Sequence, residues 1–154
     1  IPHFVNLVKT KGKKTLPLTD LHMTRFWITL QQGVDFVLSS LELMKGGEIF
    51  VPKLPSMTII ALANALVPGK PTHVVGIRPG EKLHEIMIPE DDSRTTLELD
   101  DRYIIAPAFS FWNDESYTIN GAKMVKEGYS YASNTNDEWL DADGLSQFLA
   151  EEDV

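Results

Sequence analysis

The sequence predicts an α/β fold. Strand-like apolar runs alternate with amphipathic helical segments along most of the chain, which is the pattern of α/β domains. The length of 154 residues is enough for one domain with its own core. Hydrophobic residues make up 43% and charged residues 23% of the chain, as is ordinary for a globular protein.

The first elements are short strands followed by a helix. A helix is expected over residues 3–11, and strands are expected over 16–19 and 25–29. Thr29 and Gln32 match a capping box, in which each side chain accepts a hydrogen bond from the other residue's backbone. The helix that follows carries apolar residues at i, i+3, i+4 and i+7, namely Val34, Val37, Leu38 and Leu41.

The middle of the chain continues the alternation. Residues 48–51 have the composition of a strand buried on both faces. Ser56 or Thr58 can cap a helix that runs to Leu66, and a strand is expected over 73–77. The remaining expected elements are a helical turn at 83–88, paired strands at 95–99 and 103–106, a loop-rich region at 110–136 and a final helix capped by Asp141.

Composition excludes several classes of function. The net charge is −8, with nine Lys/Arg against four Asp/Glu in residues 1–80 and five against eighteen in residues 81–154. An acidic chain of this kind is a poor binder of nucleic acid, although its basic first half suits a small anion. No apolar run is long enough for a membrane span. The absence of cysteine suits a cytoplasmic protein.

The most informative motif is the run from Ile77 to Glu85. Pro79 pushes Arg78 toward an extended conformation, and Gly80 permits a tight turn directly afterwards. An arginine presented in this way can bind a phosphate with two parallel hydrogen bonds. Arg25 lies beside another apolar run, so the two arginines can together bind a pyrophosphate if they converge. Either arginine alone is more often solvated or paired with a carboxylate.

The chain lacks the sequence motifs of a nicotinamide cofactor site. It contains no G-x-G-x-x-G phosphate loop and no Tyr-x-x-x-Lys pair. His22 and His84 have no partner at metal-ligand spacing, and residues 90–92 are interpreted as a charged loop rather than a metal site. Phe26 and Trp27 are expected in the core. No catalytic, metal-binding or cofactor-binding residue is therefore predicted in this chain.

Several motifs together resemble one enzyme family. They are Leu16 to Asp20, Met23 to Leu30, Gly47 to Lys53, Pro55 to Met57, Gly76 to Glu85 and Asn134 to Leu140. In combination they are similar to the C-terminal half of the inverting UDP-N-acetylglucosamine 4,6-dehydratases, which are extended short-chain dehydrogenase/reductases. Residues 19–23 depart from the commoner Gly-Asp-Gly turn of the wider superfamily, which leaves the path of 21–23 uncertain.

The resemblance implies a two-part enzyme of bacterial pseudaminic acid biosynthesis and flagellin glycosylation. An N-terminal Rossmann half, outside this chain, would bind NADP and carry the acid and base residues. The reaction would remove hydride at C4, eliminate water across C5–C6 and return hydride at C6, with inversion at C5. The present chain would be the UDP-sugar-binding half and would be inactive alone.

The resemblance also assigns roles to individual residues. Arg25 and Arg78 would hold the UDP phosphates, and Glu81 would contact the ribose or orient Arg78. The strand formed by Leu16, Pro17 and Leu18 would lie along the uracil. The expected partners are the UDP-sugar, the protein's own Rossmann half and further copies of the protein.

The chain is expected to form a single C-terminal substrate-binding portion of a longer protein, since it begins at Ile1. Residues 1–47 would be its first substrate-side segment, 48–70 a strand and helix returning to the Rossmann sheet, and 71–154 the Arg-Pro-Gly segment with the tail. Two alternatives remain open. One is a related UDP-sugar epimerase or retaining dehydratase, and the other is a free-standing, non-catalytic binding module.

Overall fold

The computed structural model describes residues 15–107 and 121–151. The chain divides into two compact units: unit 1 comprises residues 1–27, 55–85 and 133–154, and unit 2 comprises residues 28–54 and 86–132. Both units contain helices and strands, and the chain has both parallel and antiparallel strand pairs, which confirms the predicted α/β class. The helix expected over 3–11 lies outside the described residues.

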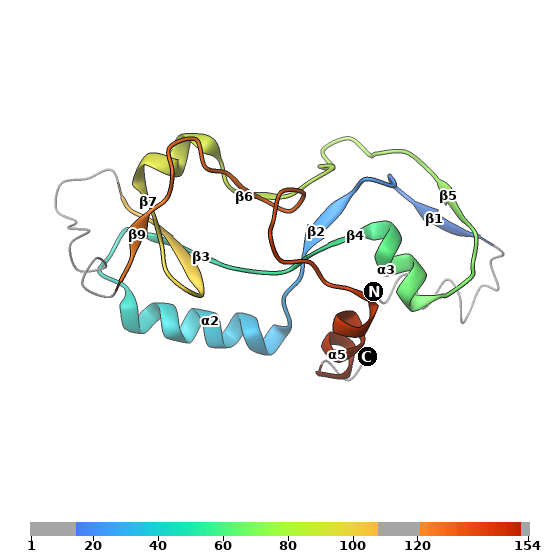
Figure 1. Ribbon diagram of the computed structural model, residues 1–154, viewed down its shortest axis with the longest axis horizontal. Helices are drawn as coiled ribbons and strands as arrows, with labels where there is room; N and C mark the ends of the chain where they lie inside the picture. The colour runs from blue at the N-terminus through green and yellow to red at the C-terminus, as the bar shows by residue number, and fades with distance from the viewer. Residues whose placement is uncertain (1–14, 108–120, 152–154) are drawn as a thin grey trace. The chain divides into compact units, whose positions relative to one another are not determined.

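Among the described residues, unit 1 contains paired strands and helices (Figure 1). β1 (Leu16–Leu18) pairs in parallel with β5 (Thr72–Val74). β2 (Thr24–Phe26) pairs antiparallel with β4 (Ser56–Thr58). The helices are α3 (Ile59–Leu66) and α5 (Ala142–Glu151).

The helix α3 organises the core of unit 1. It begins where expected, because the Thr58 hydroxyl accepts a hydrogen bond from the N–H of Ala61 at 3.1 Å, and it ends at Leu66. Packing of α3 against β1 and α5 produces two buried clusters. The first consists of Leu16, Leu18 and Ala63, and the second of Met57, Leu62 and Leu145. The predicted cap of α5 is also confirmed, since Asp141 accepts from the N–H of Gly144 at 2.8 Å.

Unit 2 is built on a four-stranded antiparallel sheet of order β3–β8–β7–β9. Its strands are β3 (Ile49–Pro52), β8 (Arg102–Ile105), β7 (Thr96–Glu98) and β9 (Lys123–Met124). The pairing of β7 with β8 confirms the strands expected at 95–99 and 103–106. The other elements are helix α2 (Leu30–Leu43), the 3-10 helix η1 (Glu90–Thr95), and the paired strands β6 (Ile86–Ile88) and β10 (Tyr131–Ala132).

The predicted capping box starts α2. The Thr29 hydroxyl accepts from the N–H of Gln32, and the Gln32 side chain accepts from the N–H of Thr29, both at 3.1 Å. These bonds satisfy two of the backbone N–H groups that a helix start leaves without partners. The N-terminal end of α2 is therefore specified by local sequence alone.

Arg102 attaches α2 to the sheet of unit 2. Its guanidinium donates to the hydroxyls of Ser40 and Ser39 at 2.9 and 2.8 Å, and lies 4.8 Å from the centre of the Phe36 ring. Asp101 accepts the remaining contacts, the shortest at 2.6 Å. The hydrogen bond from Arg102 holds the pKa of the Asp101 carboxyl below its ordinary value. Arg102 itself is buried, and these contacts compensate the desolvation of its charge.

A group of tyrosines lies beside this sheet. The hydroxyl of Tyr129 donates to that of Tyr103 at 2.6 Å, and the Tyr131 hydroxyl contacts the backbone of Leu54 at 2.7 and 3.1 Å. The ammonium of Lys53 lies 5.0 Å from the centre of the Tyr103 ring. Burial and the Tyr129 hydroxyl raise the pKa of Tyr103 well above its ordinary value. These contacts make the cluster part of the packing of unit 2.

One prediction about local structure is wrong, and another stays a prediction. Among the described residues, the strand at 49–52 is the edge strand of an antiparallel sheet and Ile49 is 59% exposed, so its burial on both faces beside a Rossmann half stays a prediction. Residues 86–88 form β6 rather than a helical turn, because they pair with β10, a segment more than 40 residues away. Parallel pairing occurs instead between β1 and β5. Composition cannot distinguish these pairings, since it carries no information about the neighbouring strand.

Arg102 yields the first test. Replacing Arg102 with Met should lower the free energy of unfolding by roughly 2–4 kcal/mol, since a charge-assisted hydrogen bond contributes about 1.5–3 kcal/mol and two serine hydroxyls lose this donor. Denaturant titration measures the change. Arg94→Met is the matched control, because its side chain is 73% exposed and lies 3.9 Å from Glu127, and it should change stability by no more than about 0.5 kcal/mol. Equal effects of the two substitutions would contradict the role of Arg102.

Candidate functional site

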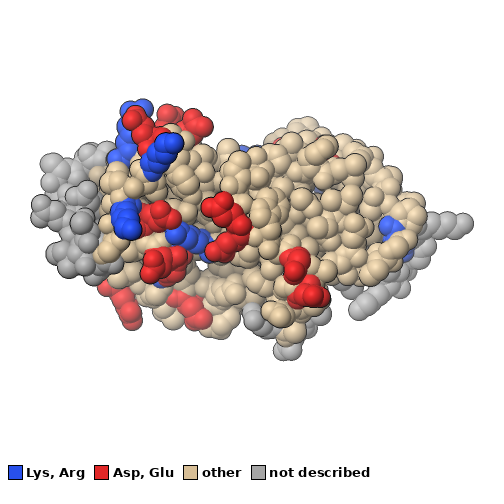
Figure 2. Space-filling view, viewed as in Figure 1, with Lys and Arg blue, Asp and Glu red and all other residues tan. Residues whose placement is uncertain are grey.

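The predicted site residues all belong to unit 1. They lie on β1, on β2 and on the loop of residues 76–85, which follows β5 and is called the arginine loop below. The surface charges also differ between the units. In the view of Figure 2, Lys, Arg, Asp and Glu side chains gather over unit 2, whereas the visible face of unit 1 is mostly uncharged.

The arginine loop contains the expected tight turn. The N–H of Glu81 donates to the carbonyl oxygen of Arg78 at 3.0 Å, with Pro79 and Gly80 between them. The φ angle of Gly80 is 81°, the value that the third position of a type II turn requires and that glycine adopts without strain. The turn is thus determined by the sequence Arg-Pro-Gly-Glu itself.

Glu81 stabilises this turn from the side. Its carboxylate accepts a hydrogen bond from the backbone N–H of Arg78 at 3.2 Å. The hydroxyl of Thr19 donates to the same carboxylate at 3.5 Å, which links the loop to the end of β1. Glu81 therefore contacts the backbone of Arg78 and leaves its guanidinium unengaged.

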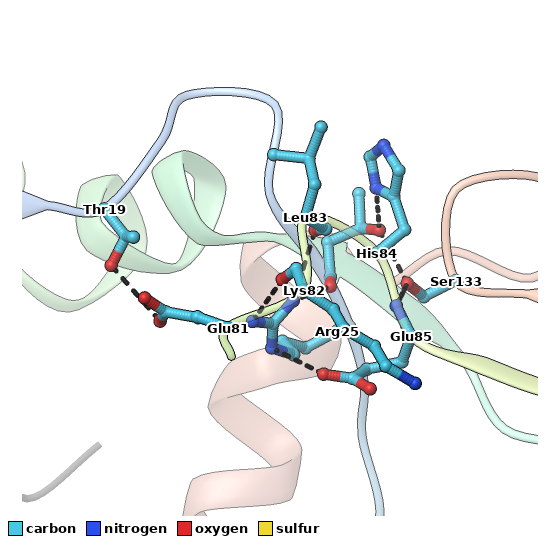
Figure 3. A network of polar contacts seen from close by, with 9 residues as sticks. Thr19, Arg25, Glu81, Lys82, Leu83, His84, Glu85 and Ser133 are labelled. Carbon is cyan, nitrogen blue, oxygen red and sulfur yellow. Dashed lines mark hydrogen bonds and ion pairs between the residues drawn. The ribbon is translucent and has the colours of Figure 1, made fainter. Parts of the chain in front are cut away.

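Arg25 is bound to the arginine loop by its side chain (Figure 3). Nη1 donates to the carbonyl oxygens of Thr24 at 2.7 Å and Leu83 at 3.2 Å, and Nη2 donates to that of Lys82 at 2.9 Å. Nε lies 3.3 Å from the Glu85 carboxylate. A guanidinium has five N–H groups, so among the described residues one N–H on Nη2 is left for a ligand.

The guanidinium of Arg78, unlike that of Arg25, is not bound within the protein. Arg78 is exposed, and only its backbone takes part in the turn. Within residues 15–107 and 121–151, the structure gives the Arg78 guanidinium no hydrogen bond or ion pair. The planar group is available for a bidentate contact with a phosphate. Of the two predicted arginines, Arg25 is mainly engaged within the protein and Arg78 is open to solvent.

A buried network joins the arginine loop to two other segments. The Thr24 hydroxyl lies 2.8 Å from Nδ1 of His84 and 2.6 Å from the Ser133 hydroxyl. The Ser133 hydroxyl also accepts from the N–H of Glu85 at 2.9 Å, and the N–H of Ser133 donates to the carbonyl of Glu85 at 2.8 Å. Sequence reasoning missed Thr24 and Ser133. Thr24 is adjacent to Arg25, but no sequence signal connects Ser133 to a loop almost 50 residues earlier.

The strand β1 places its leucines in the core. Leu16 and Leu18 are buried against Ala63, as side chains two residues apart on a strand share one face. Pro17 is half-buried and points to the other face. If this strand contacts a uracil ring, the contact would therefore be made by Pro17 and by the strand's backbone.

Trp27 has the predicted core position. It packs against the cluster of Met57, Leu62 and Leu145. Its indole nitrogen Nε1 is buried without a hydrogen-bond partner in the described part of the chain.

Residues 15–107 and 121–151 contain no group of three or more His, Cys, Asp or Glu arranged to hold a metal ion. In the same residues no helix has the length and apolar character of a membrane span.

Comparison with known proteins places these motifs in a family context. The family model described as polysaccharide biosynthesis protein matches residues 1–107. UDP-N-acetylglucosamine 4,6-dehydratase (inverting) from Campylobacter jejuni serotype O:2 is 47% identical over 97% of this chain. The protein of the same name from serotype O:23/36 is 50% identical over 90% of it. UDP-glucose 4-epimerase from Rickettsia canadensis is 34% identical over 97% of the chain.

The chain spans less than half the length of these relatives, namely 46%, 43% and 44% respectively. A solved structure, Pen from Bacillus thuringiensis, superimposes with a TM-score of 0.78 at 26% identity. That match covers 99% of this chain and 45% of the other. The likeness therefore extends over this whole chain and over part of each relative.

The difference in hydrogen bonding between Arg25 and Arg78 can be tested by measuring stability. Arg25→Lys should lower the free energy of unfolding by roughly 1.5–3 kcal/mol, because an ammonium cannot reproduce the fork of donors to two neighbouring carbonyls. Arg78→Lys, at an exposed position, should change it by no more than about 0.5 kcal/mol. Denaturant titration of both variants is the measurement. A larger loss from Arg78→Lys than from Arg25→Lys would contradict the assignment.

Proposed function

This chain belongs to the polysaccharide biosynthesis protein family, and on that basis we propose that it forms the UDP-sugar-binding half of an inverting UDP-N-acetylglucosamine 4,6-dehydratase. The full-length enzyme would be an extended short-chain dehydrogenase/reductase. Its net reaction would be loss of water from the sugar across C5–C6, giving a 4-keto-6-deoxy sugar nucleotide with inversion at C5. The observation that carries the proposal is the 47% identity to a protein of that name over 97% of this chain.

The alternatives have less support. The epimerase from Rickettsia canadensis is 34% identical to this chain, against 47% and 50% for the two dehydratases. A non-catalytic module has no counterpart among these named relatives. Dehydration is therefore the preferred reaction, and the epimerase and retaining reactions become outcomes of the product assay below.

Arg78 is the principal phosphate ligand in this proposal. Its guanidinium is exposed on a turn that Glu81 and Gly80 hold in shape. A pyrophosphate offers oxygens at the spacing of the guanidinium fork, and such charge-assisted pairs are short and directional. Arg25 would contribute one N–H to the same phosphates and would hold the loop through its carbonyl bonds. Glu81 would act by orienting Arg78, and the strand of Leu16, Pro17 and Leu18 would contact uracil through Pro17.

The cofactor belongs to the other half of the enzyme. The residues of this chain do not fit a dinucleotide, because the sequence has neither the glycine-rich phosphate loop nor the Tyr-x-x-x-Lys pair. NADP would be bound by the N-terminal Rossmann half. No proton or hydride transfer is assigned to a residue of this chain.

The biological setting follows from the same proposal. The product would enter pseudaminic acid synthesis and flagellin glycosylation in the bacterial cytoplasm. The partners would be the UDP-sugar, the Rossmann half and further copies of the protein. We also propose the division given above: residues 1–47 as the first substrate-side segment, 48–70 as a strand and helix that return to the Rossmann sheet, and 71–154 as the Arg-Pro-Gly segment with the tail.

A product assay tests the proposed reaction. The full-length enzyme should convert UDP-N-acetylglucosamine to a 4-keto-6-deoxy sugar nucleotide, and NMR spectroscopy should show inverted configuration at C5. Retained configuration at C5 would identify a retaining dehydratase. Formation of the C4 epimer without loss of water would identify an epimerase.

Substrate affinity tests the role of Arg78. In the full-length enzyme, Arg78→Ala should weaken UDP-sugar binding by about 1.5–3 kcal/mol, the contribution of a charge-assisted hydrogen bond. NADP affinity should stay unchanged, since the cofactor lies in the other half. Isothermal titration calorimetry measures both ligands, and Arg94→Ala is the control at an exposed arginine of unit 2. Equal loss of both ligands in Arg78→Ala would indicate general misfolding and refute the assignment.

A further inference from the structure

The segment that contains Ser133 is fixed to β4 within unit 1. The N–H of Ser56 donates to the carbonyl oxygen of Glu138 at 2.9 Å, and the N–H of Leu140 donates to that of Ser56 at 2.8 Å. The side chain of Asn136 donates to the Ser56 hydroxyl at 3.0 Å. Ser133 therefore belongs to a segment that is held in place by contacts in which the arginine loop takes no part.

Ser133 binds the end of the arginine loop at Glu85 (Figure 3). The N–H of Ser133 donates to the carbonyl oxygen of Glu85 at 2.8 Å, and the N–H of Glu85 donates to the Ser133 hydroxyl at 2.9 Å. The carboxylate of Glu85 lies 3.3 Å from Nε of Arg25, whose guanidinium binds the carbonyls of Lys82 and Leu83. Ser133 and Arg25 therefore bind the same stretch of the loop, residues 82–85.

The hydroxyl of Ser133 acts as a donor as well as an acceptor. It is fully buried, so its own hydrogen needs an acceptor within the protein. Among the described residues the structure gives it Oγ1 of Thr24 at 2.6 Å, and the Thr24 hydroxyl can then donate to Nδ1 of His84 at 2.8 Å. The reverse order would leave the hydrogen of Ser133 without an acceptor in this network. Ser133 is therefore the first donor, and the ring of His84 carries its hydrogen on Nε2.

Removal of the Ser133 hydroxyl would break the contacts on both of its sides. The N–H of Glu85 would lose its acceptor, and Oγ1 of Thr24 would lose its donor. The backbone N–H of Ser133 would still reach Glu85, so the end of the loop would be loosened rather than detached. Arg78 would feel this change, because in the described part of the chain its guanidinium has no contact of its own that would keep it in place.

We propose that Ser133 is a positioning residue for the phosphates of the UDP-sugar and that it acts through Arg78. The inference rests on the proposed function, in which Arg78 is the principal phosphate ligand. The Ser133 hydroxyl holds the end of the arginine loop, so that the exposed guanidinium keeps one place relative to β1 and β2. The cost of ordering the loop is then already met before the ligand binds, which favours affinity.

Steady-state kinetics of the full-length enzyme with UDP-N-acetylglucosamine test the proposal. Ser133→Ala should raise KM about three- to tenfold, the factor for a lost neutral hydrogen bond, and should leave kcat unchanged, because the phosphates are bound alike in the ground state and the transition state. A merely structural defect would reduce the amount of folded enzyme, which lowers kcat and leaves KM unchanged. That second pattern would overturn the proposal.

Ser93→Ala is the matched control for this substitution. Ser93 belongs to unit 2 and is 1% exposed, and its hydroxyl also accepts a backbone N–H, that of Gly128 at 3.1 Å. The control therefore removes a serine hydroxyl of equal burial and similar bonding away from the arginine loop. Its KM should equal that of the native enzyme, and an equal rise of KM in both variants would contradict a specific role of Ser133.

Combination with Arg78→Ala tests whether Ser133 acts through Arg78. In the Arg78→Ala enzyme, the further substitution Ser133→Ala should change the dissociation constant of UDP by less than about twofold, because the group that it positions is gone. Isothermal titration calorimetry with UDP measures both backgrounds. The same loss of affinity with and without Arg78 would show that Ser133 acts by another route and would refute the proposal.

Two substitutions of Thr24 keep the inference testable if Ser133→Ala does not fold. Valine has the shape of threonine but cannot accept the hydrogen bond from Ser133, so Thr24→Val should raise KM about three- to tenfold. Thr24→Ser keeps the hydroxyl, and its KM should stay within about twofold of the native value. A native KM in Thr24→Val would overturn the proposal.

Hydrogen exchange followed by mass spectrometry examines the loop without any ligand. Ser133→Ala should speed exchange in peptides covering residues 76–85 at least about threefold, whereas Ser93→Ala should leave it unchanged. Unchanged exchange and unchanged UDP affinity in Ser133→Ala would refute the inference and leave the proposed function standing. A native full-length enzyme that binds no UDP would refute both, so the two failures are distinguishable.

Discussion

The hydrogen bonds of Arg25 to the carbonyls of Lys82 and Leu83 hold the arginine loop against β2. A loop that follows the largely exposed strand β5 would otherwise depend on its own turn for position. The bonds are charge-assisted and directional, so they fix both the path of the loop and its distance from the strand. The buried contacts among Thr24, His84 and Ser133 strengthen the same attachment. The proposed phosphate ligand, Arg78, depends on this arrangement although it takes no part in it.

In each of the two units, an arginine holds two segments together through hydrogen bonds of its guanidinium. In unit 2, Arg102 attaches α2 to β8 through two serine hydroxyls, much as Arg25 attaches a loop to β2 through two carbonyls. In both cases several protein oxygens accept the hydrogen bonds that water would accept from the exposed guanidinium. These bonds offset the free-energy cost of removing the charge from water. An arginine with its donors engaged in this way is a structural residue. The exposed Arg78 differs from both and is therefore the better ligand candidate.

The division of labour between the two halves of the proposed enzyme follows from these details. The turn at Arg78 exposes the guanidinium that we propose as the phosphate ligand, and the sequence contains neither the glycine-rich loop nor the Tyr-x-x-x-Lys pair of a dinucleotide site.

The sequence by itself determined the features that depend on neighbouring residues. The capping box of α2, the cap of α3, the Arg-Pro-Gly-Glu turn and the hairpin of β7 and β8 were predictable because their partners are close along the chain. The tertiary structure alone decided the edge position of β3, the strand at 86–88 and the contacts of Ser133. It also decided which arginine is engaged and which is open, since the acceptors of Arg25 in the arginine loop lie nearly 60 residues away. Contacts between distant segments depend on which surfaces meet when the chain packs, and local composition carries no record of that choice.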